Sequence, residues 1–421
     1  MRGWRDAAAR PQGRSIPIQG RTAPPCAIPT PLRQRSRGRA SRSGKAVVAD
    51  RLHYIDRCRA MLMLMGIPYH AAMLYSPGWG PAQHVTSRFC DVVSQAITQF
   101  RMPAFFLIAG YFAAMLLSRR DRATWFTSRL QRLGIPLISA SLTLIPIQLF
   151  IYAIGNAGSF GQAVELFQRR IVTPSPAWIS HLWFLYDLII YSAIVAVAWP
   201  IVARLVRADQ PRAWARWPFL TMLLVIVVVA LPLSLFNPLL GTTFWGSVVN
   251  RLLRHSVFFA VGAVLYLSPP FFERWVTWRW QRAVSALVII AAATALAVSR
   301  DHYRPALLAS AGAAISGAWL VLAAMKRWGD APNKQVKLLV DASLTIYLLH
   351  HPIIVALGLV TARISLPPAV EWAAVSVATG ALSFGGYLLL RRVPILFFCF
   401  NGQLPPSRSG RPATQRIAAK V

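Results

Sequence analysis

Charged residues are scarce in this chain. Asp, Glu, Lys and Arg make up 14% of its 421 residues, against about 25% in an ordinary soluble domain. Acidic residues are the scarcest, with 13 Asp+Glu against 45 Lys+Arg, so the formal net charge is +32. The AVILMFWYC residues account for 56%. This composition excludes disorder over most of the length and argues against a soluble enzyme.

Cysteine is equally sparse. The four cysteines lie far apart, with no CxxC pair and no zinc-ligand spacing: Cys26, Cys58, Cys90 and Cys399. Such spacing predicts neither a disulfide framework nor a metal site. No apolar run precedes residue 60, so we expect no cleaved signal peptide.

Long apolar runs, by contrast, are abundant. A helix needs about 20 apolar residues to cross the hydrocarbon core of a bilayer. Ten segments qualify: 57–75, 92–117, 133–155, 181–203, 217–236, 252–268, 283–299, 304–325, 338–360 and 369–390. The pattern predicts an all-α fold, a polytopic integral membrane bundle of about ten transmembrane helices.

The basic residues follow the loops of this bundle. With a cytoplasmic N-terminus, 36 of them fall on the inner segments and 8 on the outer loops, and Arg101 lies inside the second span. This bias follows the positive-inside rule and predicts that both termini are cytoplasmic. Charge dispersed in this way predicts no nucleic-acid partner, because nucleic-acid binding needs a clustered basic surface. The predicted partners are the lipid bilayer and the substrates.

The chain divides into a long apolar region and two polar ends. Residues 1–50 are rich in Arg, Ser and Pro and predict a disordered basic cytoplasmic tail. A tail that binds anionic lipid, a start codon placed too far upstream and a transit peptide all remain open for this segment. Residues 51–395 form the predicted transmembrane domain, and residues 396–421 form a polar C-terminal tail.

Ionisable residues inside membrane spans are costly and usually functional. In the first span Arg59 and His70 are eleven residues apart, about three helical turns and ~16 Å, and so lie on one face. Asp56 lies three residues before Arg59, within reach of an ion pair. Gly66 and Pro68 should loosen the helix just before His70.

Further ionisable residues enter the bundle from other spans. Arg101 lies beside Met102-Pro103 in the second span. Arg129 and Arg132, at i and i+3, open the third span on the cytoplasmic side and form a fork suited to phosphates, with plain topogenic charge as the alternative. His181 opens the fourth span on the outer side, and His350 lies near the middle of the ninth.

In order along the chain, these residues resemble acyltransferase family 3, a family of membrane-bound acyltransferases. Five motifs carry the resemblance: Arg59-X10-His70, FRMPAFFLIAGYF (100–112), Arg129-X-X-Arg132, HLWFLYDL (181–188) and YLLHHP (347–352). The last two resemble most the branch implied to succinylate osmoregulated periplasmic glucans. Many members read Ser-Gly-Phe where this chain has Ala109-Gly110-Tyr111, so we expect no serine nucleophile there.

The resemblance implies O-acyl transfer from a cytoplasmic acyl-CoA, succinyl-CoA or acetyl-CoA, to a glycan hydroxyl in the periplasm or at the cell surface. Arg129 and Arg132 would hold the CoA phosphates, and His70 would act as general base on the hydroxyl. Arg59 would orient the site or stabilise negative charge, held in turn by Asp56. A covalent acyl-His step stays open. No metal is expected.

Three residues are second-tier candidates. Arg101 would stabilise the oxyanion, and His181 and His350 would bind the acceptor or relay protons. The alternative function is a secondary transporter with an intramembrane His/Arg/Asp pathway. We find no paired interrupted helices in two halves, and transport leaves the arginine fork unexplained, so the sequence favours the enzyme. The expected location is the bacterial inner membrane.

Overall fold

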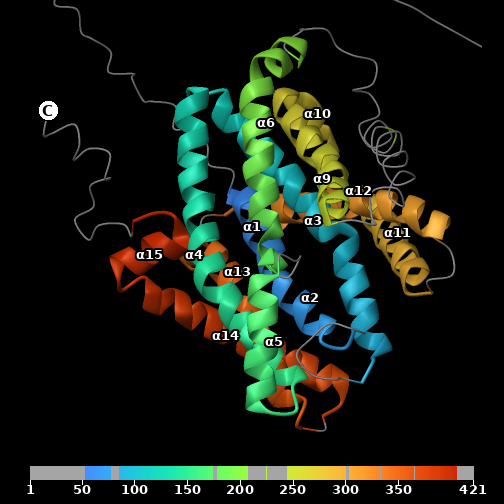
Figure 1. Cartoon of the computed structure of the whole chain (residues 1–421). Coiled ribbons are helices and arrows are strands. Elements are labelled where there is room, and N and C mark those ends of the chain that lie inside the picture. Colours follow the sequence, from blue (N-terminus) through green and yellow to red (C-terminus); the bar gives the residue numbers. More distant parts are fainter. Residues whose placement is uncertain are drawn as a thin grey trace, which may run out of the picture. The chain divides into compact units, whose positions relative to one another are not determined.

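The structure, a computed structural model, describes residues 53–76, 85–173, 178–206, 224, 244–299, 303–331, 333–364 and 366–404. Every element within these residues is a helix (Figure 1). The predicted tail over residues 1–50 lies outside the described residues. So do the span over 217–236, apart from Leu224, and most of the C-terminal tail.

Among the described residues, eight helices are long and apolar enough to cross a membrane. They are α3 (Arg88–Leu117), α4 (Arg122–Asn156), α6 (Trp183–Val206), α9 (Phe244–Leu267), α11 (Trp280–Ser299), α12 (Tyr303–Trp328), α13 (Lys334–Thr361) and α14 (Pro368–Leu390). Each coincides with one of the ten predicted spans. The all-α polytopic architecture is therefore confirmed, while the count of ten and the cytoplasmic termini stay predictions.

The first predicted span is divided in two. Helix α1 (His53–Leu64) ends and α2 (Gly66–Met73) begins on either side of Met65. Backbone hydrogen bonds from Met65 N to Met61 O and from Tyr69 N to Met65 O carry the chain across the break. The break falls where Gly66 and Pro68 predicted a loosened helix, because proline has no N–H to donate to the preceding turn.

Short helices and side-chain caps mark the ends of the long ones. The short helices are α5 (Phe160–Val172), the 3-10 turn η2 (Ser180–Leu182), α10 (Pro269–Trp275) and α15 (Pro394–Asn401). Asp121 starts α4 by accepting the Thr124 backbone N–H at 3.0 Å. The same hydrogen bond holds the pKa of Asp121 below its usual value.

Helix α3 forms the core of the described bundle. It packs against α9, α11, α12 and both halves of the broken span. A Cβ on Gly110 would lie 1.9 Å from the carbonyl oxygen of Phe259, and one on Gly262 would lie 1.8 Å from that of Leu107. The backbones of α3 and α9 therefore touch through two glycines, a contact common between membrane helices.

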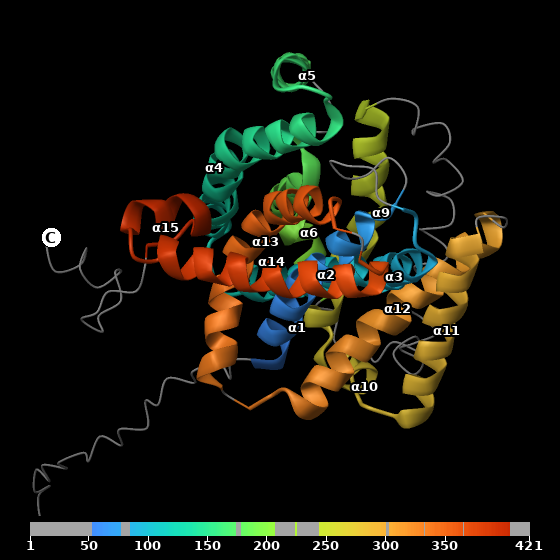
Figure 2. The same cartoon turned by 90° about the horizontal axis from the view of Figure 1, so that it is seen from below.

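A second group of helices brings the histidine-bearing segments together. Helix α13 packs against α4, α14 and both α1 and α2, and η2 contacts α4. Helices α4 and α6 run side by side in Figure 1, and Figure 2 shows α14 crossing α13. Helix α2 thus packs against α13, and η2 reaches the middle of α13 through the contact of His181 with the Leu348 carbonyl.

Candidate active site

Four histidines from three elements converge. The ring of His70, on α2, lies 5.3 Å from that of His350 and 4.8 Å from that of His351, both on α13. The ring of His181, in η2, lies 5.5 Å from His350 and stacks on His351 at 4.6 Å with planes 5° apart. The structure thus joins His70, His181 and His350, which the sequence singled out, and adds His351.

Protein groups fix these rings. His181 Nε2 lies 3.2 Å from the Leu348 carbonyl oxygen, and His350 Nδ1 lies 2.5 Å from that of Tyr347. The Tyr347 hydroxyl donates to the His181 carbonyl. A carbonyl only accepts, so the bonded nitrogen of each ring carries the hydrogen. In His350 that leaves a lone pair on Nε2, an atom that is buried without a hydrogen-bond partner among the described residues.

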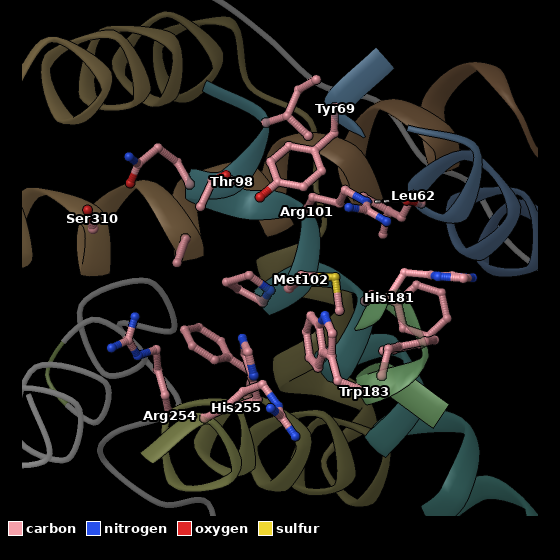
Figure 3. A pocket seen from close by; sticks show the side chains of 18 of the residues that line it. Leu62, Tyr69, Thr98, Arg101, Met102, His181, Trp183, Arg254, His255 and Ser310 are labelled. Atoms are coloured by element: carbon pink, nitrogen blue, oxygen red, sulfur yellow. Dashed lines mark hydrogen bonds between the residues drawn. The ribbon is translucent and has the colours of Figure 1, made fainter. Parts of the chain in front are cut away.

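Arg101 lies beside this cluster, buried at 7% exposure. Its Nε donates to the Leu62 carbonyl at 3.0 Å, and its guanidinium lies 5.4 Å from the centre of the Tyr69 ring (Figure 3). A Cβ on Gly66 would come within 2.7 Å of Arg101 Nη2 and 3.4 Å of His350 Nε2. No carboxylate in the described part of the chain forms an ion pair with Arg101.

A cavity of about 450 Å³ opens beside these residues, a volume within the range of small-molecule sites. Figure 3 shows Arg101 and Tyr69 on one side and Trp183 and His255 on the other. Polar side chains of three helices, α3, α9 and α12, line it: Thr98, Gln99, Ser247, Asn250, Arg251, Arg254 and Ser310, with His70, His181 and Tyr347 among the other lining residues.

One wall of the cavity combines aromatic rings with an ion pair. The rings of Trp183 and His255 stack at 5.6 Å, and the Arg251 guanidinium lies 5.1 Å from the Trp183 ring centre. Arg251 also holds the fully buried Asp187 through two hydrogen bonds of 3.0 and 3.1 Å. This ion pair joins α6 to α9 across 64 residues of sequence.

The remaining candidates gather away from the cavity. Asp56 and Arg59 pair at 3.8 Å, as their spacing predicted, and Arg59 lies 5.6 Å from the centre of the Phe112 ring. Arg59, Arg129 and Arg132 lie within electrostatic range of one another. Because α4 begins at Arg122, the two α4 arginines lie in its second and third turns rather than at its first residues.

No group of three or more His, Cys, Asp or Glu among the described residues is arranged to hold a metal ion. The four histidines instead contact one another, backbone carbonyls and the side-chain amide of Gln148, whose Oε1 lies 2.8 Å from His351 Nδ1. Their arrangement is suited to accepting and passing protons, because neutral imidazole both accepts and donates.

A family model for an acyltransferase domain, that of acyltransferase family 3, matches residues 52–389. The chain belongs to this family. Proteins named glucans biosynthesis protein C are similar to this chain over nearly their whole length. The one from Salmonella typhi is 26% identical over 390 residues, covering 87% of this chain and 99% of the relative. The one from Salmonella typhimurium is 26% identical over 388 residues, covering 87% and 98%. No solved structure matches.

The resemblance found in the five motifs, including that to the glucan branch, is therefore confirmed. The protein is a multi-pass membrane acyltransferase, and its family favours this activity over secondary transport. His351, Gln148 and the Asp187–Arg251 pair are the parts of the site that the sequence did not identify. The HHP block contained one of them, because His351 follows His350 directly.

Proposed function

We propose that this acyltransferase moves an acyl group, succinyl or acetyl, from a cytoplasmic acyl-CoA to a hydroxyl of a periplasmic or cell-surface glycan. It would act in the bacterial inner membrane. The observation that carries the proposal is the position of His70, which lines a cavity together with Arg101 and with polar groups from four other helices.

The donor side rests on the inner arginines. By the positive-inside prediction, Arg59, Arg129 and Arg132 lie toward the cytoplasm, where acyl-CoA is found. Three guanidinium groups lie within electrostatic range of one another, and the two carboxylates in range among the described residues, Asp56 and Asp341, offset only part of their charge. A bound anion is therefore favourable. Guanidinium also matches phosphate oxygens through paired hydrogen bonds. The CoA phosphates suit this cluster, and its thioester would extend toward His70.

The chemical step uses the residues around the cavity. The acceptor O–H bond breaks, its proton passes to a nitrogen of His70, and its oxygen forms a bond to the thioester carbonyl. Arg101, buried and without a carboxylate partner among the described residues, stabilises the resulting oxyanion. The C–S bond then breaks, and the CoA thiolate takes up a proton and leaves as the thiol.

The acceptor side rests on the direction of the helices. Lining residues come from the N-terminal parts of α3, α6, α9 and α12, and these ends lie outside in the predicted topology. Trp183 presents an aromatic ring to the cavity, and Asn250, Ser247 and Ser310 present polar side chains, a combination that suits a sugar. The names of the relatives point to glucan biosynthesis, which is consistent with such an acceptor.

The test is acyl transfer by the purified protein in lipid vesicles. Succinyl-CoA and acetyl-CoA are added in separate reactions with a mixed glycan extract, and the masses of the glycans are measured by mass spectrometry. We expect a mass gain that is lost in a folded His70→Ala variant and kept in His53→Ala, a histidine outside the cavity. Release of CoA without glycan modification would refute the acceptor. Consumption of neither donor by the folded protein would refute the proposal.

A further inference from the structure

Gln148, on α4, lies between two of the histidines and is 3% exposed. Its Oε1 is 2.8 Å from His351 Nδ1, and its Nε2 is 3.0 Å from Ser180 Oγ. The Ser180 hydroxyl in turn lies 3.5 Å from His181 Nδ1. One amide therefore links the HHP segment of α13 to the histidine of η2.

The Leu348 carbonyl, at one end of this hydrogen-bonded series, fixes which atom donates and which accepts in each of its hydrogen bonds. The Leu348 carbonyl accepts from His181 Nε2, so the neutral His181 ring has its lone pair on Nδ1. The Ser180 hydroxyl donates to that lone pair and accepts from the Gln148 NH₂ group. The Gln148 oxygen must then face His351 and accept its Nδ1–H. All donors and acceptors agree with this assignment of the hydrogens and of the amide.

The backbone at this point is unusual. Ser180 has φ +40° and is, within the described residues, the one non-glycine residue with a positive φ. This conformation costs free energy and persists where its surroundings impose it. The Tyr347 hydroxyl, donating to the His181 carbonyl, and the Gln148 amide hold the turn from two sides. The strained turn places Ser180 within reach of both Gln148 and His181.

The consequence falls on His351. With its hydrogen on Nδ1 and bound to Gln148, the neutral ring carries its lone pair on Nε2. The same ring meets His70 edge to face, with centroids 4.8 Å apart and planes at 74°. A proton acceptor is thus held next to the proposed base. The groups that face it include His70 from α2, His181 from η2, His350 on its own helix and the Gln148 amide from α4.

We propose that Gln148 is a positioning residue that fixes His351 as the proton acceptor for His70. The proposal rests on the proposed role of His70. The proton taken from the acceptor hydroxyl passes from His70 to His351 Nε2, while Gln148 retains the hydrogen on Nδ1. The proton returns through His70 to the CoA thiolate, so the site regains its starting state. This arrangement keeps positive charge off His70 during attack on the thioester.

Two substitutions test the role of the amide. Gln148→Leu removes both hydrogen bonds, whereas Gln148→Glu keeps an oxygen that accepts from His351 Nδ1. We expect Gln148→Leu to lower kcat about 10- to 100-fold, by analogy with the loss of groups that orient metal-binding histidines, with KM for acyl-CoA unchanged. Gln148→Glu should recover most of kcat, and Gln281→Leu, on the exposed face of α11, should match wild type. A Gln148→Leu enzyme with wild-type kcat would overturn the proposal, as would a Glu variant no better than Leu.

A second measurement does not depend on turnover. Nitrogen-15 NMR of histidine-labelled protein in bilayers reports which ring nitrogen carries hydrogen, with the His351 signal assigned by its loss in His351→Gln. We expect Nδ1–H in the wild type and a changed signal in Gln148→Leu. A His351 protonated only at Nε2 in an active wild type overturns this proposal alone. The expected NMR signal in a protein that transfers no acyl group refutes the proposed function instead, and the relay with it.

Discussion

Gly110 of α3 lies directly against the carbonyl of Phe259 on α9, with room for no side chain between them: a Cβ would come within 1.9 Å of the oxygen. The contact is with backbone rather than with a flexible side chain, so neither partner can move aside alone. The glycine of the AGYF segment is thus explained by helix packing. Its neighbours Ala109 and Tyr111 are buried in the same core.

We therefore predict that Gly110→Ala forces α3 and α9 apart and destabilises the protein by about 1–3 kcal/mol, the usual cost of overpacking. The control is Gly380→Ala on α14, where a Cβ meets nothing within 4 Å. Thermal unfolding in detergent, followed by tryptophan fluorescence, compares the two. Equal melting temperatures for both variants would contradict this account of the contact.

Gly66→Ala should act on activity more than on folding. The added Cβ would lie 2.7 Å from Arg101 Nη2, the end of a flexible side chain that can shift. We expect a protein of near-normal melting temperature whose kcat falls at least tenfold, because the guanidinium no longer lies where the oxyanion forms. Gly385→Ala, in open space on α14, should keep full kcat. A wild-type kcat in Gly66→Ala would contradict the proposed role of Arg101 in stabilising the oxyanion.

We predict that loss of the ion pair between Asp187 and Arg251 lowers the free energy of unfolding, because Asp187 is fully buried. Removing the arginine in Arg251→Leu leaves the fully buried Asp187 carboxylate unpaired, which costs about 3–5 kcal/mol. The double variant Asp187→Leu/Arg251→Leu should be more stable than Arg251→Leu. A double-mutant cycle on chemical denaturation checks this expectation, and strictly additive single effects would mean that the two groups do not interact.

The inner arginines should affect donor binding. We expect Arg132→Gln to raise KM for acyl-CoA about 10-fold, the loss of one charge-assisted hydrogen bond, with little change in kcat. Arg120→Gln, an exposed arginine just before α4, controls for charge alone. Steady-state kinetics at two salt concentrations separate a specific contact from general attraction. Equal changes in KM for the two substitutions would indicate that Arg129 and Arg132 serve only as topogenic charge.

The sequence predicted the helices well because each one needs only a local signal. Apolar length located eight described spans, and Gly66 with Pro68 located the break in the first one. The ionisable residues His70, Arg101, His181 and His350 were found because such groups stand out in apolar segments. Whether such residues meet depends on packing, and the structure brings His70 and His181 against the ring of His350.

Gln148 and the Asp187–Arg251 pair could not be found in this way. A single amide in an apolar span leaves no periodic pattern, and its role depends on a histidine 203 residues away. Asp187 and Arg251 are separated by 64 residues, part of which lies outside the described structure. Pairings of this kind depend on which helix faces touch, and hydropathy does not encode that choice.

The hydrogen bond between Arg101 Nε and the Leu62 carbonyl joins the core helix to the last turn of α1, just before the break that precedes His70. Arginine has five donors in a rigid fork, and this bond uses only one of them, so the others keep a fixed direction. A lysine could supply the charge but not the direction. Folding therefore orients this cation, so no free energy is needed to align it when the substrate binds. The substrate enters an electric field that is already in place.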